Sequence, residues 1–443
     1  MKLIKSISGI RGIFGQTLNE DIASYFSRSF AENQPNGKIL LARDTRPHGK
    51  KLYHSIIDAL CLMGRDVLDC GIIPTPTAQF IIKEKKLAGG IVITASHNPI
   101  EWNGLKFLDK DGCFINKDKM QILLNYSPIF STEYTGTIID ANNAFLDHIS
   151  NVLSLKCINF DKIREKNIKV VVDTVNGAAY KMLPNLLEKL NCDVIKIHCD
   201  NNGIFPRGTE PIPSHLEDLS KAVIKHKADI GFATDPDADR LAIVDNTGLP
   251  IGEESTLILA LESYLKYYQD SQKVVTNLST SMAIDIIAKK YNSTVERSSV
   301  GEINVVQKMK NIGSAIGGEG NGGVILKESH LGRDSLVAST LILNHLAESN
   351  LPLNEIMENI PHFVMIKDKT TLQSDIDFND IKAQFKNEDD ITFIESDGLK
   401  ILWKDKWVHI RKSNTEPIIR IISEAADNDT AKGLIDSIKN III

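Results

Sequence analysis

Short hydrophobic segments alternate with amphipathic segments through most of the chain. Five of the hydrophobic segments are rich in β-branched residues and bounded by Gly, Asp or Pro, which is typical of buried strands. They span residues 38–42, 90–94, 169–173, 229–233 and 241–245. The amphipathic segments have the spacing of helices and span 49–63, 178–190 and 214–225. This alternation predicts an α/β fold with mixed, mostly parallel sheets that carry helices on both faces.

The last part of the chain has a different pattern. Strand-like segments at 361–367, 399–403, 407–411 and 418–423 follow one another, with polar helical segments at 375–387 and 429–439. The turn Lys404–Lys406 has the length of a hairpin connection. Runs of strands with separate helices predict a smaller α+β domain.

Helix starts and domain boundaries follow from the same pattern. Ser214, with Glu217 three residues later, has the form of a capping box and predicts the start of a helix. A chain of 443 residues is long enough for three or four domains. Breaks near residues 150, 250 and 362 predict four: 1–150, 151–250, 251–361 and 362–443.

Composition narrows the class of protein. With 51 basic and 57 acidic residues the net charge is −6, which argues against nucleic acid as a partner. The sequence has no apolar run long enough to span a membrane, so we expect no membrane partner. Six cysteines without a Cys-x-x-Cys pair, and a start without an apolar signal core, predict a reduced, cytoplasmic protein.

The segment Thr94–Pro99 (TASHNP) directly follows a predicted buried strand. Ligands of open α/β sheets bind at the carboxyl ends of strands, so Ser96 lies where a nucleophile or phosphoacceptor would be placed. Taken alone, Ser96 and His97 fit an ordinary turn equally well or better. The chain continues to Lys106, which returns a cation to the same region.

A second segment, Asp235–Arg240 (DPDADR), lies between two predicted strands. Asp235, Asp237 and Asp239 alternate with Pro236 and Ala238, so the three carboxylates project to one side. Carboxylates forced together repel unless a cation neutralises them, and hard oxygen ligands suit Mg²⁺, Mn²⁺ or Ca²⁺. The alternative is a solvated acidic turn, which seldom lies between two buried strands.

Two further loops carry candidate binding residues. Five glycines in 317–323 let the backbone approach a ligand, and leave Glu319 and Asn321 to hydrogen-bond, as sugar hydroxyls would require; a flexible glycine turn fits equally well. The segment 411–417, with Arg420 nearby, concentrates donors for phosphate oxygens, although a polar hairpin loop is the alternative.

Together these segments resemble the α-D-phosphohexomutase family. The resemblance covers nearly the whole chain and follows the family's order: GIRG at 9–12, TASHNP at 94–99, DPDADR at 235–240, GGEGNGG at 317–323 and RKSNTEP at 411–417. It implies three similar α/β domains and a smaller C-terminal α+β domain around one central cleft. In chain order they would be a phosphoserine-loop domain, a metal-binding-loop domain, a sugar-binding-loop domain and a phosphate-binding domain.

The resemblance also implies roles for individual residues. Ser96 matches the serine that is phosphorylated, and the residues grouped around it are Arg11, His97 and Lys106, of which Lys106 is the candidate for proton transfer. The implied Mg²⁺ ligands are Asp235, Asp237, Asp239 and the phosphoserine at Ser96. The implied substrate-binding residues are Arg240, Glu319, Asn321, Arg411, Ser413, Asn414, Thr415 and Arg420.

The implied reaction converts a hexose 6-phosphate into a hexose 1-phosphate through phosphoserine and an enzyme-bound hexose 1,6-bisphosphate, which also serves as activator. A covalent phosphoserine intermediate divides one difficult phosphoryl transfer into two easier ones, and each of them depends on positioning and on neutralising charge. One departure is Gly323, where many relatives have a histidine, so a histidine acid/base role is not transferred to this loop. Another is the opening Ser6–Ile10 in place of the family's Phe-Gly-Thr-x-Gly-Ile.

The combination of GEGNGG and SNTEP resembles bacterial and archaeal members described as phosphoglucosamine mutases or phosphomannomutases. Of these two sugars we expect glucosamine phosphate, because a bacterial cell needs glucosamine 1-phosphate for its wall. Phosphomannomutase and phosphoglucomutase activities are the alternatives within the family. Outside it stand a sugar phosphatase with an aspartate nucleophile and a phosphosugar-binding protein without turnover. The expected partner is a small phosphosugar, and the expected state is a monomer or homodimer.

Overall fold

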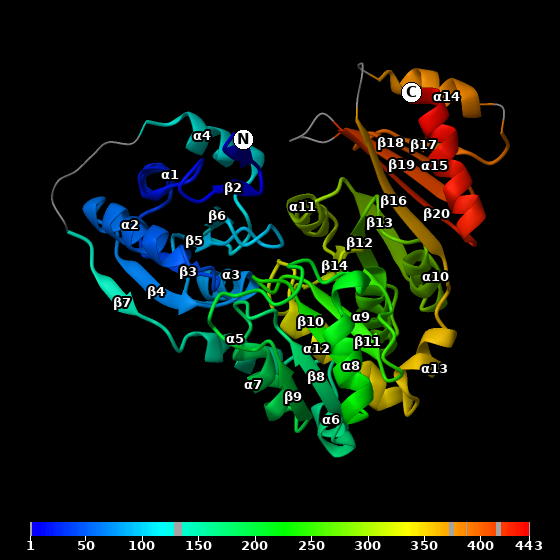
Figure 1. Cartoon of the computed structure of the whole chain (residues 1–443), viewed down its shortest axis with the longest axis horizontal. Helices are drawn as coiled ribbons and strands as arrows, with labels where there is room; N and C mark the ends of the chain where they lie inside the picture. The colour runs from blue at the N-terminus through cyan, green and yellow to red at the C-terminus, as the bar shows by residue number, and fades with distance from the viewer. Residues whose placement is uncertain (1, 128–134, 372–375, 387, 413–417, 443) are drawn as a thin grey trace. The chain divides into compact units, whose positions relative to one another are not determined.

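The computed structural model describes residues 2–127, 135–371, 376–386, 388–412 and 418–442 (Figure 1). Its chain forms two compact units, each built from two segments. The first unit contains residues 1–268 and 321–357, and the second contains 269–320 and 358–443. The chain therefore passes between the units three times.

The first sheet of the first unit has seven strands in the order β1-β2-β6-β5-β3-β4-β7. The pairs β1–β2, β2–β6 and β5–β6 are antiparallel and the others are parallel. The strands are β1 Ile4–Ser6, β2 Gly9–Ile13, β3 Ile39–Arg43, β4 Val67–Ile72, β5 Gly89–Ile93, β6 Trp102–Asp109 and β7 Ile138–Asp140. The helices are α1 Glu20–Glu32, α2 Gly49–Leu62, α3 Thr75–Glu84, α4 Lys117–Asn125 and α5 Phe145–Val152.

Alternating positions on these strands explain the layers. Ile39 and Leu41 of β3 and Ile91 and Ile93 of β5 lie in one core cluster with apolar residues of α1, α2 and α4. On the other face, α3 packs against β5 and brings Ile82 up to Gly90. Helices thus cover both faces, and the carboxyl ends of β3 and β5 carry the loops that follow (Figure 1).

The second sheet of the first unit has the order β11-β10-β8-β9, with β10–β11 antiparallel and the other pairs parallel. Its strands are β8 Lys169–Asp173, β9 Asp193–Ile197, β10 Ile230–Thr234 and β11 Leu241–Asp245. The remaining elements of this unit are α6 Phe160–Lys166, α7 Met182–Lys189, the 3₁₀ turn η1 Pro213–His215, α8 Glu217–His226, α9 Glu253–Tyr268, β15 Gly323–Leu326, α12 Ser335–Ser349 and α13 Leu353–Glu358, at whose end the chain passes to the second unit.

The second unit contains the parallel strands β13-β12-β14 and an antiparallel five-stranded sheet, β16-β20-β19-β18-β17. The parallel part consists of β12 Lys273–Asn277, α10 Ala283–Lys290, β13 Thr294–Ser298, α11 Glu302–Ile312 and β14 Ile316–Glu319. The antiparallel part consists of β16 Val364–Thr371, α14 Phe378–Phe385, β17 Thr392–Ile394, β18 Leu399–Leu402, β19 Trp407–Lys412, β20 Ile418–Ala425 and α15 Asn428–Ile442.

The predicted fold class is confirmed: α/β sheets precede a smaller α+β part. The start of α8 was predicted wrongly, however. Ser214 lies within η1, and Leu216, without a side-chain hydrogen bond, occupies the cap position of α8. The reason is local, because Pro213 starts the 3₁₀ turn and His215 bonds through Nδ1 to the carbonyl oxygen of Glu210.

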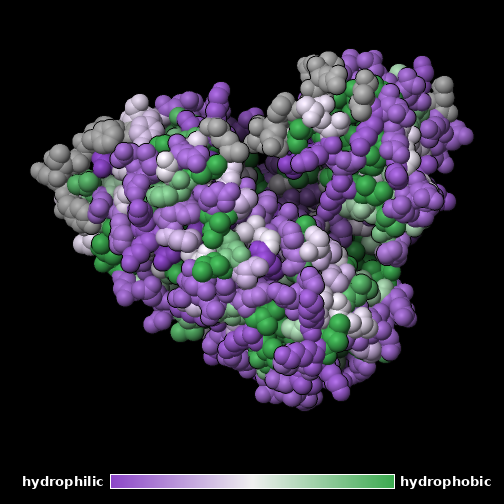
Figure 2. Space-filling view, in the orientation of Figure 1, coloured by the Kyte–Doolittle hydropathy of each residue, from purple (hydrophilic) through white to green (hydrophobic). Residues whose placement is uncertain are grey.

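The surface seen in Figure 2 is mainly hydrophilic, with scattered hydrophobic residues. Among the described residues, no helix is both long and apolar enough to cross a membrane.

Candidate active site

Ser96 lies in the loop after β5, in a conformation that is unusual for a serine. Its φ is +50°, in the left-handed region, and its side chain is almost completely buried. The Ser96 backbone N–H donates to Thr94 Oγ1 at 2.9 Å, and Ser96 Oγ donates to Asp235 Oδ2 at 3.0 Å. Strained backbone of this kind persists where the surroundings enforce it, and here it directs the hydroxyl at the acidic loop.

Arg46 holds this loop in place. Its guanidinium donates to four backbone carbonyl oxygens, those of Ser96, Asn98, Pro99 and Trp102, at 2.5–3.0 Å. Asp44 accepts from Arg46 Nε at 3.0 Å and from Thr94 Oγ1 at 2.7 Å. Arg46 and Asp44 are fully buried, and sequence reasoning gave neither a role, because backbone acceptors leave no sequence pattern.

The acidic loop joins β10 to β11. Asp235, Asp237 and Asp239 are fully buried, and each offers a carboxylate oxygen within 4.8 Å of the others. Ala238 between them has a φ of +56°. The predicted projection of the three carboxylates to one side is therefore how the structure arranges them.

Cations partly balance these carboxylates. Lys106, on β6, lies 2.5 Å from Asp237 Oδ2 and 3.4 Å from Asp239 Oδ2 through its Nζ atom. Thr75 Oγ1 donates to Asp237 Oδ2 at 2.5 Å. Arg333 Nη2 donates to Asp239 Oδ2 at 2.6 Å. Arg333 and Thr75 are further site residues that the sequence analysis missed.

The charges divide the three carboxyls into two kinds. Burial, with the nearby Asp239 and Asp237 charges, raises the pKa of Asp235 well above its usual value. Burial opposes ionisation of Asp237 too, but Lys106 and Thr75 outweigh it and lower its pKa. Conversely, Asp237 and Asp239 raise the pKa of Lys106 despite its burial, so Lys106 is an ammonium ion near neutral pH.

The donor set fits a hard divalent cation. Asp237 Oδ1 and Asp239 Oδ1 are buried, and within the described parts of the chain neither has a hydrogen-bond partner. Buried carboxylate oxygens left without partners are costly. Oxygen ligands of this type are the ones Mg²⁺ prefers, so the acidic loop could hold Mg²⁺.

Arg11, His97 and Arg240 border the serine loop. Arg11, on β2, donates to Asn98 Oδ1 at 3.0 Å. Arg240 donates through Nη1 to Glu210 at 2.8 Å and lies 3.2 Å from His97 Nδ1 through Nη2. Burial, with the charges of Arg240 and Arg11, lowers the pKa of His97 to about 3, so its imidazole is neutral near pH 7.

The second unit contains the predicted hydroxyl-binding Glu319, at the end of β14. Glu319 Oε1 accepts from Asn277 Nδ2 and from the Gly301 N–H, both at 2.8 Å. Asn321 belongs to the first unit, and its buried Oδ1 has no hydrogen-bond partner among the described residues.

The predicted phosphate clamp is also in the second unit. Arg411, on β19, lies 3.0 Å from Asp397 Oδ2 through Nε, and Asp397 Oδ2 also accepts from the Val300 N–H at 2.8 Å. Arg420 is opposite Arg411 in the β19–β20 register. Ser413, Asn414 and Thr415 lie outside the described residues. Asp397, which no sequence pattern singled out, fixes the arginine of this group.

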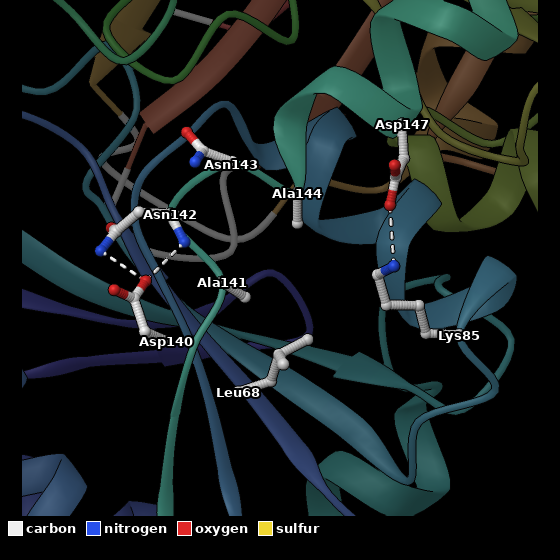
Figure 3. Close-up of a pocket in the computed structure, with 8 residues that line it drawn as sticks. All are labelled: Leu68, Lys85, Asp140, Ala141, Asn142, Asn143, Ala144 and Asp147. Atoms are coloured by element: carbon white, nitrogen blue, oxygen red, sulfur yellow. Dashed lines mark hydrogen bonds and ion pairs between the residues drawn. The ribbon is translucent and has the colours of Figure 1, made fainter.

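A surface pocket of about 570 Å³ lies elsewhere in the first unit, between β4, β7 and α5 (Figure 3). Asp140 and Asn142 are hydrogen-bonded on one side of it, and Lys85 pairs with Asp147 on the other side at 2.7 Å. No residue predicted for the site lines this pocket.

Family patterns match the chain in sequence order. Those for the phosphoglucomutase/phosphomannomutase alpha/beta/alpha domains I, II and III match residues 2–127, 143–248 and 252–363, and that for the C-terminal domain matches 366–441. The chain belongs to the phosphoglucomutase/phosphomannomutase family. It is therefore a phosphohexomutase, an isomerase that transfers a phosphoryl group within a sugar phosphate, as the sequence predicted.

Individual members of the phosphoglucomutase/phosphomannomutase family resemble the chain along its whole length. A phosphoglucosamine/phosphogalactosamine mutase of Sulfurisphaera tokodaii is 31% identical, over 98% of both chains. A phosphoglucomutase/phosphomannomutase of Thermococcus kodakarensis is 33% identical, over 96% of this chain and 95% of its own. A solved family member from Burkholderia thailandensis is 25% identical with a TM-score of 0.86, over 99% of this chain and 97% of its own.

Proposed function

We propose that this phosphohexomutase interconverts glucosamine 6-phosphate and glucosamine 1-phosphate through phosphoserine at Ser96. The observation that carries the mechanism is the hydrogen bond from Ser96 Oγ to Asp235, which joins the serine to the buried acidic loop. The sugar is supported by relatives named phosphoglucosamine mutase, at about 30% identity. Phosphomannomutase or phosphoglucomutase activity is the alternative, in keeping with the Thermococcus kodakarensis relative.

The first transfer moves the phosphoryl group from Ser96 Oγ to a free hydroxyl of the bound sugar phosphate. The bond between phosphorus and Ser96 Oγ breaks while a bond from phosphorus to the sugar oxygen forms. The sugar hydroxyl loses its proton and Ser96 Oγ gains one, so glucosamine 1,6-bisphosphate and the free serine result. The other phosphoryl group of the bisphosphate is then transferred to Ser96 Oγ. This second transfer regenerates the phosphoserine and leaves glucosamine 1-phosphate. Lys106, an ammonium ion that contacts Asp237 and Asp239, is proposed to give a proton to Ser96 Oγ and to regain one from the attacking sugar hydroxyl.

Asp235, Asp237, Asp239 and the Ser96 phosphate would hold Mg²⁺, which neutralises phosphoryl oxygens when bound. Arg11 and Arg240 are proposed to contact the phosphoserine, and neutral His97 to keep Arg240 in place. Glu319 and Asn321 are proposed to bind sugar hydroxyls. Arg411, Ser413, Asn414, Thr415 and Arg420 are proposed to bind the phosphate that is not being transferred.

A ³¹P NMR assay with Mg²⁺ and a trace of hexose 1,6-bisphosphate tests this proposal. The 6-phosphates of glucosamine, mannose, glucose and N-acetylglucosamine are supplied in parallel. We expect a 1-phosphate signal to grow fastest with glucosamine. Faster conversion of mannose or glucose would assign the alternative activity, and inorganic phosphate as the product would indicate a phosphatase.

Replacing Arg411 tests the clamp. Arg411→Ala removes a charge-assisted phosphate contact, typically worth about 1.5–3 kcal/mol, so the KM for the hexose phosphate is expected to rise about 10- to 100-fold. Steady-state kinetics measure it, with the exposed Arg164→Ala as the matched control because Arg164 pairs only at the surface of α6. An unchanged KM and kcat would remove Arg411 from the clamp.

A further inference from the structure

The space beside Gly323 is filled by the side chain of Arg333. A Cβ atom added to Gly323 would lie 2.8 Å from Arg333 Cγ and closer still to Cδ, well inside van der Waals contact, and 3.2 Å from Asn321 Oδ1. Gly323 does not have a positive φ, so its backbone would accept a side chain. Position 323 must therefore be glycine, because the Arg333 side chain occupies the space that a Cβ atom would need.

The backbone on both sides of Arg333 is pinned. Arg333 forms a bridge with Ile325, and the Asp334 N–H donates to the Val324 carbonyl oxygen at 2.9 Å. On the other side, Ser335 Oγ donates to the carbonyl oxygen of Ala238, in the acidic loop, at 2.8 Å. The backbone of Arg333 is therefore held in place next to the acidic loop that the Arg333 side chain contacts.

A buried cluster reinforces this point. Asp334 Oδ1 caps α12 by accepting from the Leu336 and Val337 N–H groups. Asp334 Oδ2 lies 3.0 Å from His148 Nε2 and 3.1 Å from His330 Nε2. All three side chains are buried, so the residue that follows Arg333 has little freedom to move.

Arg333 acts on one particular carboxylate. Its Nη2 donates to Asp239 Oδ2 at 2.6 Å, and both side chains are buried. Asp239 Oδ1 is then the oxygen left without a hydrogen bond among the described residues. A guanidinium that occupies one carboxylate oxygen fixes the rotamer and the direction of the other.

We propose that Arg333 is a positioning residue of the acidic loop. Gly323, having no side chain, leaves the space that the Arg333 side chain occupies on its way to Asp239. Arg333 directs Asp239 Oδ1 into the site, and this chain has an arginine in the space that a side chain at position 323 would occupy. The proposal rests on the proposed role of Asp239, and extends it to two residues that no motif assigned.

A double-mutant cycle tests the pairing without metal or substrate. Thermal unfolding is measured in chelator for the wild type, Gly323→Ala, Arg333→Ala and the double variant. Gly323→Ala is expected to lower the Tm by about 2–6 °C, as overpacking does, and by less than about 1 °C once Arg333 is alanine. Additive shifts would overturn the pairing.

Gly332→Ala is the matched control. Gly332 also lacks a positive φ, and its added Cβ would also meet a side chain, that of Gln79. Arg333→Ala should therefore leave the cost of Gly332→Ala unchanged. Relief of both glycine variants by Arg333→Ala would mean general loosening and would overturn the proposal.

Kinetics test the positioning. Arg333→Met keeps most of the side-chain volume but removes the guanidinium, and should lower kcat about 10- to 100-fold with KM changed less than about threefold. Gly323→Ala should lower kcat in the same way, and Arg333→Lys should recover part of it. An unchanged kcat in Arg333→Met would overturn the role. Absence of turnover in the wild type would instead refute the proposed function, while the unfolding cycle still decides the pairing.

Discussion

Ser96→Ala is expected to abolish interconversion of hexose 6- and 1-phosphates. The variant removes the Oγ atom that would carry the phosphoryl group, and the nearby hydroxyl of Thr94 is already engaged with Asp44 and with the Ser96 N–H. We expect the ³¹P NMR assay to show no conversion, even with added 1,6-bisphosphate. Wild-type protein incubated with ³²P-labelled bisphosphate should retain label, and the variant should not.

The same variant separates the two enzyme classes. An aspartate nucleophile in the acidic loop would take the phosphoryl group itself, so Ser96→Ala would keep turnover and label. The contacts disfavour this, since Asp237 Oδ2 is occupied by Lys106 and Thr75, and Asp235 accepts from Ser96. A circular dichroism spectrum like that of the wild type confirms the fold of the variant. Near-wild-type conversion would refute the phosphoserine mechanism.

Asp237→Asn is expected to lower turnover by at least about 100-fold and leave the fold intact. The amide removes a charge from the proposed Mg²⁺ site, and also the partner 2.5 Å from Lys106. Lys106 then retains only the more distant Asp239 oxygen, at 3.4 Å. Thr75 Oγ1 can still donate to the amide oxygen, so the packing changes little.

A magnesium titration after chelation measures this effect. We expect the wild type to lose activity in chelator and recover it with Mg²⁺, and Asp237→Asn to require more Mg²⁺ and to recover little. Asp193→Asn is the matched control, because Asp193, on β9, is an exposed carboxylate paired with Lys169 of β8. Activity of Asp237→Asn that equals the wild type throughout the titration would remove Asp237 from the metal site.

Much of the fold was predictable because its strands are short, buried and sharply bounded. The segments predicted at 169–173 and 241–245 have the same bounds as β8 and β11 in the structure. Helix starts were harder. The segment predicted at 178–190 forms a helix only at Met182–Lys189, since an apolar pattern continues through the turn that precedes the first helical hydrogen bonds.

The site residues that could be predicted stand in local motifs, and those that were missed have partners far away in the sequence. Ser96 and the three aspartates stand in short motifs, so their chemical roles can be predicted from the residues next to them in the sequence. Arg46 acts on backbone carbonyl oxygens about 50 residues away, and Arg333 acts on Asp239 at a separation of 94 residues. Such partners meet only after folding, and nothing in the local sequence marks them. The sequence shows that position 323 is glycine, but the reason for it appears only when the structure places the Arg333 side chain against that position.

The threefold passage of the chain between the two units has a consequence for biosynthesis. The ribosome completes the first unit only after residue 357, when residues 269–320 of the other unit have already emerged without their C-terminal partner segment. Domains fold as units while the chain is made. The nascent protein therefore displays the β12–β14 strands in an incomplete unit until its final segment arrives, a window in which chaperones would find a binding site. A ribosome stalled once residue 357 has left the exit tunnel should accordingly carry a folded acidic loop and a chaperone-accessible insertion.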